Sequence, residues 1–105
     1  MLLIREVFNC QPGKVKPMVE KFRTMARLTA KSGQGTVRIL TDFVAEQYWT
    51  IVAEFEVPNL KAFEDMMSGQ GPQMSPEDQK EMEQVFSGYH DLVVKGRREI
   101  WKIEG

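Results

Sequence analysis

The segment from Thr36 to Val57 constrains the fold most, because it contains two stretches of alternating apolar and polar residues that are close together in the sequence. Thr36 to Val44 alternates in this way, and Gln47 to Val57 does the same. Such alternation places successive side chains on opposite faces of a β-strand. Only Ala45-Glu46-Gln47 separates the two patterns, and so short a connection predicts an antiparallel hairpin.

The second strand of this hairpin divides its side chains between two faces. One face suits a layer of helices and carries Trp49, Ile51, Ala53, Phe55 and Val57. The other face carries Tyr48, Thr50, Val52, Glu54 and Glu56. We therefore expect the first set to be buried under helices.

A strand and a helix precede the hairpin. Leu2 to Phe8 is rich in apolar and β-branched residues and is followed by a Pro-Gly turn, which predicts a first strand. From Lys14 to Lys31, apolar residues recur at spacings of three and four, which predicts an amphipathic helix.

A broken helix and a strand follow the hairpin. Leu60 to Met67 predicts a short helix with Asn59 as its N-cap. Ser75 is a predicted N-cap for a further helical piece that runs towards Tyr89, and Pro76 occupies its first position. Val93 to Glu104 again has strand character, with a bulge or kink expected at Gly96.

The order strand, helix, two strands, broken helix, strand predicts an α+β protein. Two right-handed crossover units joined by a hairpin form a ferredoxin-like βαββαβ sandwich, which has a four-stranded antiparallel sheet with helices on one face. Neither a linker nor an internal repeat divides the 105 residues. We expect one domain, 1–105.

Composition excludes several classes of function. One Cys and one His are too few for a disulfide framework or a multi-histidine metal centre, and we expect neither a metal nor a cofactor. A net charge of -1 gives no general attraction to nucleic acid, and no segment approaches the roughly 20 apolar residues that cross a bilayer. The early charges after Met1 suit a strand better than a signal peptide. We expect a cytoplasmic protein that binds neither nucleic acid nor membrane.

The first and last strands carry apolar residues on both faces, so the sheet face opposite the helices needs a cover. A chain of this length buries only about 65% of its unfolded surface. The same face of a second copy is the simplest cover, because a two-fold interface uses one patch twice. We therefore predict a homodimer through the open sheet face. The alternative is a sheet whose outer face is simply solvated.

Two stretches carry a resemblance to a known group of proteins. One is Ile4-Arg5-Glu6-Val7-Phe8 followed by Gln11-Pro12-Gly13-Lys14-Val15 and the helix through Phe22, and the other runs from Tyr48 to Phe55. With them the chain resembles the dimeric α+β barrel superfamily, which includes antibiotic-biosynthesis monooxygenase-like and NIPSNAP-like proteins. The resemblance implies a homodimer whose sheets close into a barrel, with a ligand cleft between each sheet and its helices. It implies no single reaction, because relatives include cofactor-free oxygenases, haem degraders and isomerases.

Three residues are candidate catalytic groups: His90, Arg38 and Asn9. His90 is the only imidazole, the side chain best suited to proton transfer near neutral pH. Its alternative is a surface or helix-capping role. Arg38 has the charge to hold an anion, although it could equally pair with Glu54 across the hairpin or across the dimer.

The candidate ligand-binding residues are mainly aromatic and methionine side chains: Tyr48, Trp49, Glu54, Met66, Met67, Phe86 and Trp101. Together with a lid formed by Ser68 to Met74, they predict a cleft for a small apolar or aromatic molecule. Two hypotheses stay open, a cofactor-independent monooxygenase or isomerase and a non-enzymatic binding or assembly module.

Haem binding is a third hypothesis, to be tested through His90. The resemblance to haem-degrading members is incomplete. Asn9 lies beyond the family position, where Glu6 stands, and Met66 replaces the expected Trp.

Overall fold

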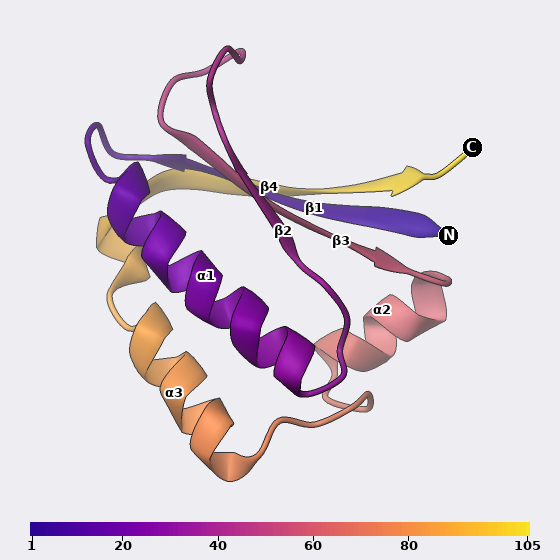
Figure 1. Cartoon of the computed structure of the whole chain (residues 1–105). Coiled ribbons are helices and arrows are strands. Elements are labelled where there is room, and N and C mark those ends of the chain that lie inside the picture. The colour runs from indigo at the N-terminus through magenta and orange to yellow at the C-terminus, as the bar shows by residue number, and fades with distance from the viewer.

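The computed structural model describes residues 1–105 and contains one four-stranded antiparallel sheet with helices on one side (Figure 1). The sheet order is β2-β3-β1-β4. In chain order the elements are β1 (Leu2–Cys10), α1 (Val15–Lys31), β2 (Arg38–Thr41), β3 (Thr50–Val57), α2 (Leu60–Met67), α3 (Pro76–Phe86), the short 3-10 helix η1 (Tyr89–Asp91) and β4 (Val93–Lys102). This arrangement confirms the predicted α+β, ferredoxin-like fold.

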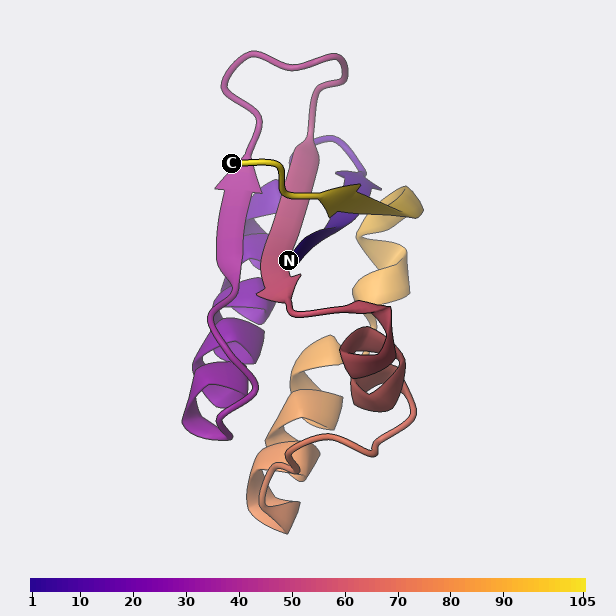
Figure 2. The ribbon, with the colours of Figure 1, turned by 90° about the vertical axis from the view of Figure 1, so that its right-hand side faces the viewer.

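The register of the strands shows which face of the sheet meets the helices. Ile4 of β1 is opposite Phe55 of β3 and Ile100 of β4, and Ile4 belongs to the buried core. The inner face of β1 therefore carries Leu2, Ile4, Glu6 and Phe8. The outer face, called the open face below, carries Leu3, Arg5, Val7 and Asn9 of the same strand. No helix covers it (Figure 2).

The core has two parts. The larger part packs α1 against the sheet through Cys10, Met18, Phe22, Ile51 and Ala53. The smaller part packs α2 against the other end of the sheet through Ile4, Val57 and Phe63. As predicted, Ile51, Ala53 and Val57 are buried on the inner face.

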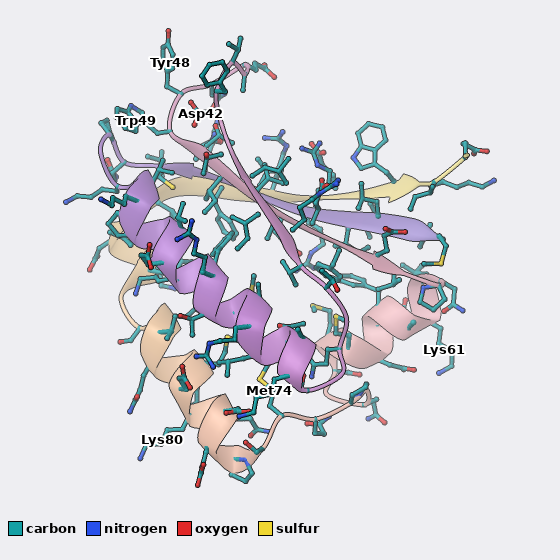
Figure 3. All side chains as sticks on the ribbon, viewed as in Figure 1. Asp42, Tyr48, Trp49, Lys61, Met74 and Lys80 are labelled. Carbon is teal, nitrogen blue, oxygen red and sulfur yellow. The ribbon has the colours of Figure 1, made fainter.

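The hairpin differs from its prediction, because pairing ends earlier. Strand β2 ends at Thr41 and β3 begins at Thr50, so the connecting loop spans residues 42–49. The backbone N–H of Thr50 donates to the Asp42 carboxylate at 2.8 Å, which closes the hairpin. The loop projects away from the helices (Figures 1 and 3). Trp49, expected on the inner face, lies in this loop with a φ of 61° and is 43% exposed.

The predicted helix starts are confirmed. The Asn59 side chain accepts a hydrogen bond from the backbone N–H of Ala62 at 2.9 Å, and Ser75 accepts one from Asp78 at 3.2 Å. The last helical piece is broken, however. Gly88 adopts a φ of 78° between α3 and η1, a conformation that suits glycine and ends a regular helix.

Gly96 has a different role from the predicted bulge or kink. The register shift in this region lies opposite Asn9 and Cys10, whereas Gly96 pairs regularly with Phe8. A Cβ at position 96 would lie 2.7 Å from Cδ1 of Phe8. Glycine is therefore required here because the Phe8 ring occupies the space of a side chain.

Gly96→Val is expected to lower the free energy of unfolding by about 1–3 kcal/mol, because overpacking forces the Phe8 ring or the backbone to move. Urea denaturation checks this value. Gly105→Val is the control, since nothing lies within 4 Å of that Cβ. Equal midpoints for the two variants would show that the Phe8 ring moves without cost.

Burial of Cys10 predicts a pH dependence of stability. Desolvation raises the pKa of the Cys10 thiol, and the charge of Asp42 adds to this effect. As pH rises above roughly 8.5, the thiol of the unfolded chain loses its proton first, so the native state loses stability until the raised pKa is passed. The loss of stability between neutral pH and about pH 10 is expected to be smaller in Cys10→Ala than in the wild type. Equal losses in denaturant titrations would contradict this prediction.

Candidate functional site

A large cavity lies between the inner face of the sheet and the helices. Its volume is about 610 Å³, and 12 of its 17 lining residues are hydrophobic. Cavities of roughly 300–1,000 Å³ accommodate small organic ligands. The sheet contributes Phe8, Ala53 and Phe55, and α1 contributes Phe22 and Met25. The cavity is thus the predicted cleft between sheet and helices.

The cavity persists because α3 is held by α1 rather than packed onto the sheet. The ammonium group of Lys31 lies 3.0 Å from an Asp78 carboxylate oxygen, and Arg27 pairs with Glu81 at 2.5 Å. The ammonium group of Lys21 also donates to the carbonyl oxygen of Val85 at 2.5 Å. These three contacts hold one side of α3 against α1. The space between α3 and the sheet stays open.

Methionines form much of the cavity wall. They come from α1, α2, the loop after α2, and α3: Met25, Met66, Met67, Met74 and Met82. Met74 belongs to the segment expected to act as a lid (Figure 3). Methionine side chains are flexible and polarisable, so such a wall adapts to ligands of different shapes.

One ion pair forms the main charged feature of the cavity. Nε of Arg98 lies 2.5 Å from an oxygen of Glu6, and both residues belong to the cavity lining. The guanidinium also lies over the Phe63 ring, 5.1 Å from its centroid. Glu6 and Arg98 are opposite each other on β1 and β4. They give a mainly apolar cavity a place where a polar group of a ligand can bind, and Thr29, Gln34 and Glu83 are the other polar residues of its lining.

The structure brings three of the predicted site residues to the cavity, namely Met66, Met67 and Phe86. The other seven lie elsewhere. Tyr48 and Trp49 are in the exposed β2–β3 loop, where Tyr48 points away from the helices (Figure 3). Asn9, Arg38, Glu54 and Trp101 lie on the open face.

His90 also lies outside the cavity. It is exposed on η1, and its ring stacks on Tyr89 with centroids 4.0 Å apart. It lines a separate, shallower hollow beside β4. The structure therefore does not bring His90, Arg38 and Asn9 together into one catalytic group.

The charged residues of the open face form a network that crosses all four strands. Nε of Arg38 donates to Glu54 at 2.7 Å, and Glu54 also lies 3.3 Å from Nε of Arg5. Arg5 in turn pairs with Glu99 of β4 at 3.3 Å. The predicted pairing of Arg38 with Glu54 across the hairpin is thus confirmed. Because Glu54 is 95% buried even in a single chain, these two arginines are needed to balance its charge.

Glu99 ends this network. Hydrogen bonds from Arg97 and from the indole N–H of Trp101 lower the pKa of Glu99, because both stabilise the charged carboxylate. Trp101 therefore has a contact on the open face in addition to its apolar surface.

The sequence patterns did not single out Glu6 and Arg98 as site residues. Strand alternation leaves two candidate faces for each of them, and the pairing of β1 with β4 is needed to place both under the helices. The one sequence signal for this site was Glu6, an acidic residue within the otherwise mainly apolar first strand.

The structure contains neither a group of metal-ligating side chains nor a helix suited to crossing a membrane. Nowhere do three or more His, Cys, Asp or Glu residues gather in a way that could hold a metal ion. None of the helices combines the length and the apolar character needed to cross a membrane.

Comparisons with known proteins agree at the level of fold. No protein-family model and no curated protein matches the sequence. Among solved structures, an uncharacterised NIPSNAP-like domain protein from Burkholderia xenovorans is similar with a TM-score of 0.70 and 11% identity, over 97% of this chain and 84% of that one. A candidate antibiotic biosynthesis monooxygenase from Deinococcus radiodurans has a TM-score of 0.67 and 11% identity, over 100% and 94% of the two chains.

A protein from Agrobacterium tumefaciens is also similar, with a TM-score of 0.74 and 12% identity over 97% of this chain and 92% of that one. At such low identities the similarity concerns backbone architecture and carries no site residues. This chain therefore has the ferredoxin-like fold of the NIPSNAP-like and antibiotic biosynthesis monooxygenase-like proteins, as the resemblance of its sequence indicated.

Proposed function

We propose that this protein binds a small apolar or aromatic molecule in the cavity between its sheet and its helices, and that it does so as a homodimer. The cavity itself carries the proposal. It has the volume of a ligand site, and 12 of its 17 lining residues are hydrophobic. The loop from Ser68 to Met74 is its proposed lid, supported by the place of Met74 in the cavity wall.

Binding is better supported than turnover. The residues expected to move a proton or hold an anion lie outside the cavity, as described for His90, Arg38 and Asn9. A non-enzymatic binding module is therefore favoured over an oxygenase or isomerase. Haem does not fit either, because His90, the expected ligand of its iron, is exposed and outside the cavity wall.

The open face supports the homodimer. Trp101 and Leu40 expose 55% and 37% of their surfaces on it. The charges between them are already paired within one chain through Arg38, Glu54, Arg5 and Glu99. A second copy that covers this central network therefore buries charges that already have partners, which reduces the main cost of covering a charged surface.

The neutral dye phenylnaphthylamine, whose fluorescence rises in apolar surroundings, provides the test of binding. We expect saturable binding in which Thr29→Trp, on the α1 side of the cavity, lowers affinity at least about tenfold by filling the space. Thr24→Trp is the matched control, because Thr24 is on the same helix but outside the cavity lining. Unsaturable binding, or equal affinities of the two variants, would contradict the proposed function.

A further inference from the structure

Two charged side chains of the open face have no partner within the chain. They are Glu56 of β3 and Lys95 of β4, which the register places on this face and which are both exposed. Neither takes part in any ion pair of the chain. The other charged residues of the strands on this face belong to the network described above, which Arg97 joins by pairing with Glu99 at 2.8 Å. One negative and one positive charge therefore remain uncompensated.

These two charges lie at opposite corners of the open face. Glu56 pairs with Leu3 at the start of β1, and Lys95 pairs with Asn9 near its other end. The strand between Leu3 and Asn9 is about 20 Å long at roughly 3.4 Å per residue. β3 and β4 flank β1 on opposite sides, and the end of β3 and the start of β4 lie at opposite ends of the sheet (Figure 1). Glu56 and Lys95 are thus on a diagonal and too far apart to pair within one chain.

A diagonal of this kind restricts how two copies can face each other. A two-fold axis between two open faces turns one copy over relative to the other. When the axis runs along the diagonal, lysine meets lysine and glutamate meets glutamate. When the axis crosses the diagonal at right angles, each lysine meets a glutamate of the other copy, and the symmetry produces this contact twice. Of these two orientations, only the second gives complementary charges, whereas the first opposes like charges in the interface.

We propose that the two copies of the homodimer adopt the second orientation, in which Lys95 of each copy pairs with Glu56 of the partner subunit. The partner of the open face is then a second copy of this chain, and two equal ion pairs fix its orientation. The central network, whose charges are already paired, lies between these ion pairs. This inference rests on the homodimer of the proposed function and adds how its two copies are arranged.

Charge reversal at each position tests the two ion pairs. The homodimer of Lys95→Glu has two contacts between glutamates, and the homodimer of Glu56→Lys has two contacts between lysines. We expect each variant to raise the dissociation constant of the homodimer about tenfold or more, because repulsion replaces attraction in two places. Sedimentation velocity of the full-length protein over a range of concentrations measures this change against the wild type.

A mixture of the two variants provides the sharper test. In a mixed dimer, one copy has glutamate at both positions and the other has lysine at both, so both contacts again join opposite charges. An equimolar mixture of Lys95→Glu and Glu56→Lys is therefore expected to dimerise with a dissociation constant within about threefold of the wild-type value. The double variant with both changes in one chain is expected to recover in the same way. Misfolded chains could not recover, so the test does not depend on the stability of either single variant.

Glu77→Lys and Lys80→Glu are the matched controls. Both residues are exposed on α3, on the helical side of the sheet, where Lys80 points away from the molecule (Figure 3). These variants change the net charge as the test variants do. They are expected to leave the dissociation constant of the dimer unchanged, alone and in a mixture.

The outcomes separate the orientation from the homodimer on which it rests. If the wild type dimerises and the single variants at positions 56 and 95 dimerise equally well, the orientation is overturned and the homodimer stands. The same conclusion follows if the mixture fails to recover, or if the control variants weaken the dimer to the same extent. If the wild type remains monomeric at high micromolar concentration, the homodimer is overturned together with the orientation.

Discussion

Phe22→Ala is expected to lower the free energy of unfolding by about 3–5 kcal/mol, the usual cost of removing a buried phenylalanine side chain. Phe22 is only 2% exposed, and its ring contacts Phe8 and Phe86 with centroids 5.8 and 6.1 Å apart. It thereby connects α1 with both the sheet and α3. Because it also lines the cavity, its removal leaves additional empty space that the neighbouring helices cannot fill without moving. Urea or thermal denaturation measures the loss.

Phe43→Ala is the matched control for this variant. Phe43 is fully exposed in the β2–β3 loop, so the same truncation is expected to change stability by no more than about 0.5 kcal/mol. A loss of similar size in both variants would mean that the loop is packed against the protein in solution. A negligible loss in Phe22→Ala would mean that α1 is not packed as described.

Leu40→Glu is expected to weaken the proposed homodimer about a hundredfold or more. Leu40 lies on β2 on the open face, opposite Val52 of β3. In a dimer that buries this face, a glutamate would lose its water without gaining a cation, because Arg38 is already paired with Glu54. A hundredfold change in the dissociation constant corresponds to about 2.8 kcal/mol. Sedimentation velocity over a range of concentrations measures it.

Leu60→Glu controls for the general effect of adding a carboxylate in place of leucine. Leu60 is exposed at the start of α2, on the helical side of the sheet. The Leu60→Glu variant is expected to leave the dissociation constant of the dimer unchanged. Trp101→Ala, on the open face, is expected to weaken the dimer by about 2 kcal/mol or more. A wild-type protein that remains monomeric at high micromolar concentration would contradict the proposed assembly.

Local sequence patterns predicted the helix boundaries well, because spacing and capping depend only on residues within the helix or next to it. The predicted helix Leu60–Met67 agrees with α2 at both ends, and Ser75 caps α3 as expected. The hairpin was wrong at its tip because alternation alone does not show where a strand loses its neighbours. The pairing of β2 with β3 stops at Thr41 and Ile51, so Phe43 and Trp49 remain in the loop despite their favourable pattern.

The candidate site was predicted in part for the same reason. Met66, Met67 and Phe86 belong to helices whose apolar faces were readable from spacing, and they do line the cavity. His90 was chosen for its chemistry, yet the turn at Gly88 places it on η1, outside the cavity. Glu6 and Arg98 were not chosen, because each acquires its place only through the pairing of β1 with β4.

By itself, the sequence determined the order of the elements, the fold class and most helix boundaries, since periodicity and capping act over a few neighbouring residues. Tertiary structure alone decided which face of β1 and β4 meets the helices, because alternation has two equivalent solutions until the register is known. It also decided that α3 is fastened to α1 and held off the sheet, and this long-range contact leaves the cavity open.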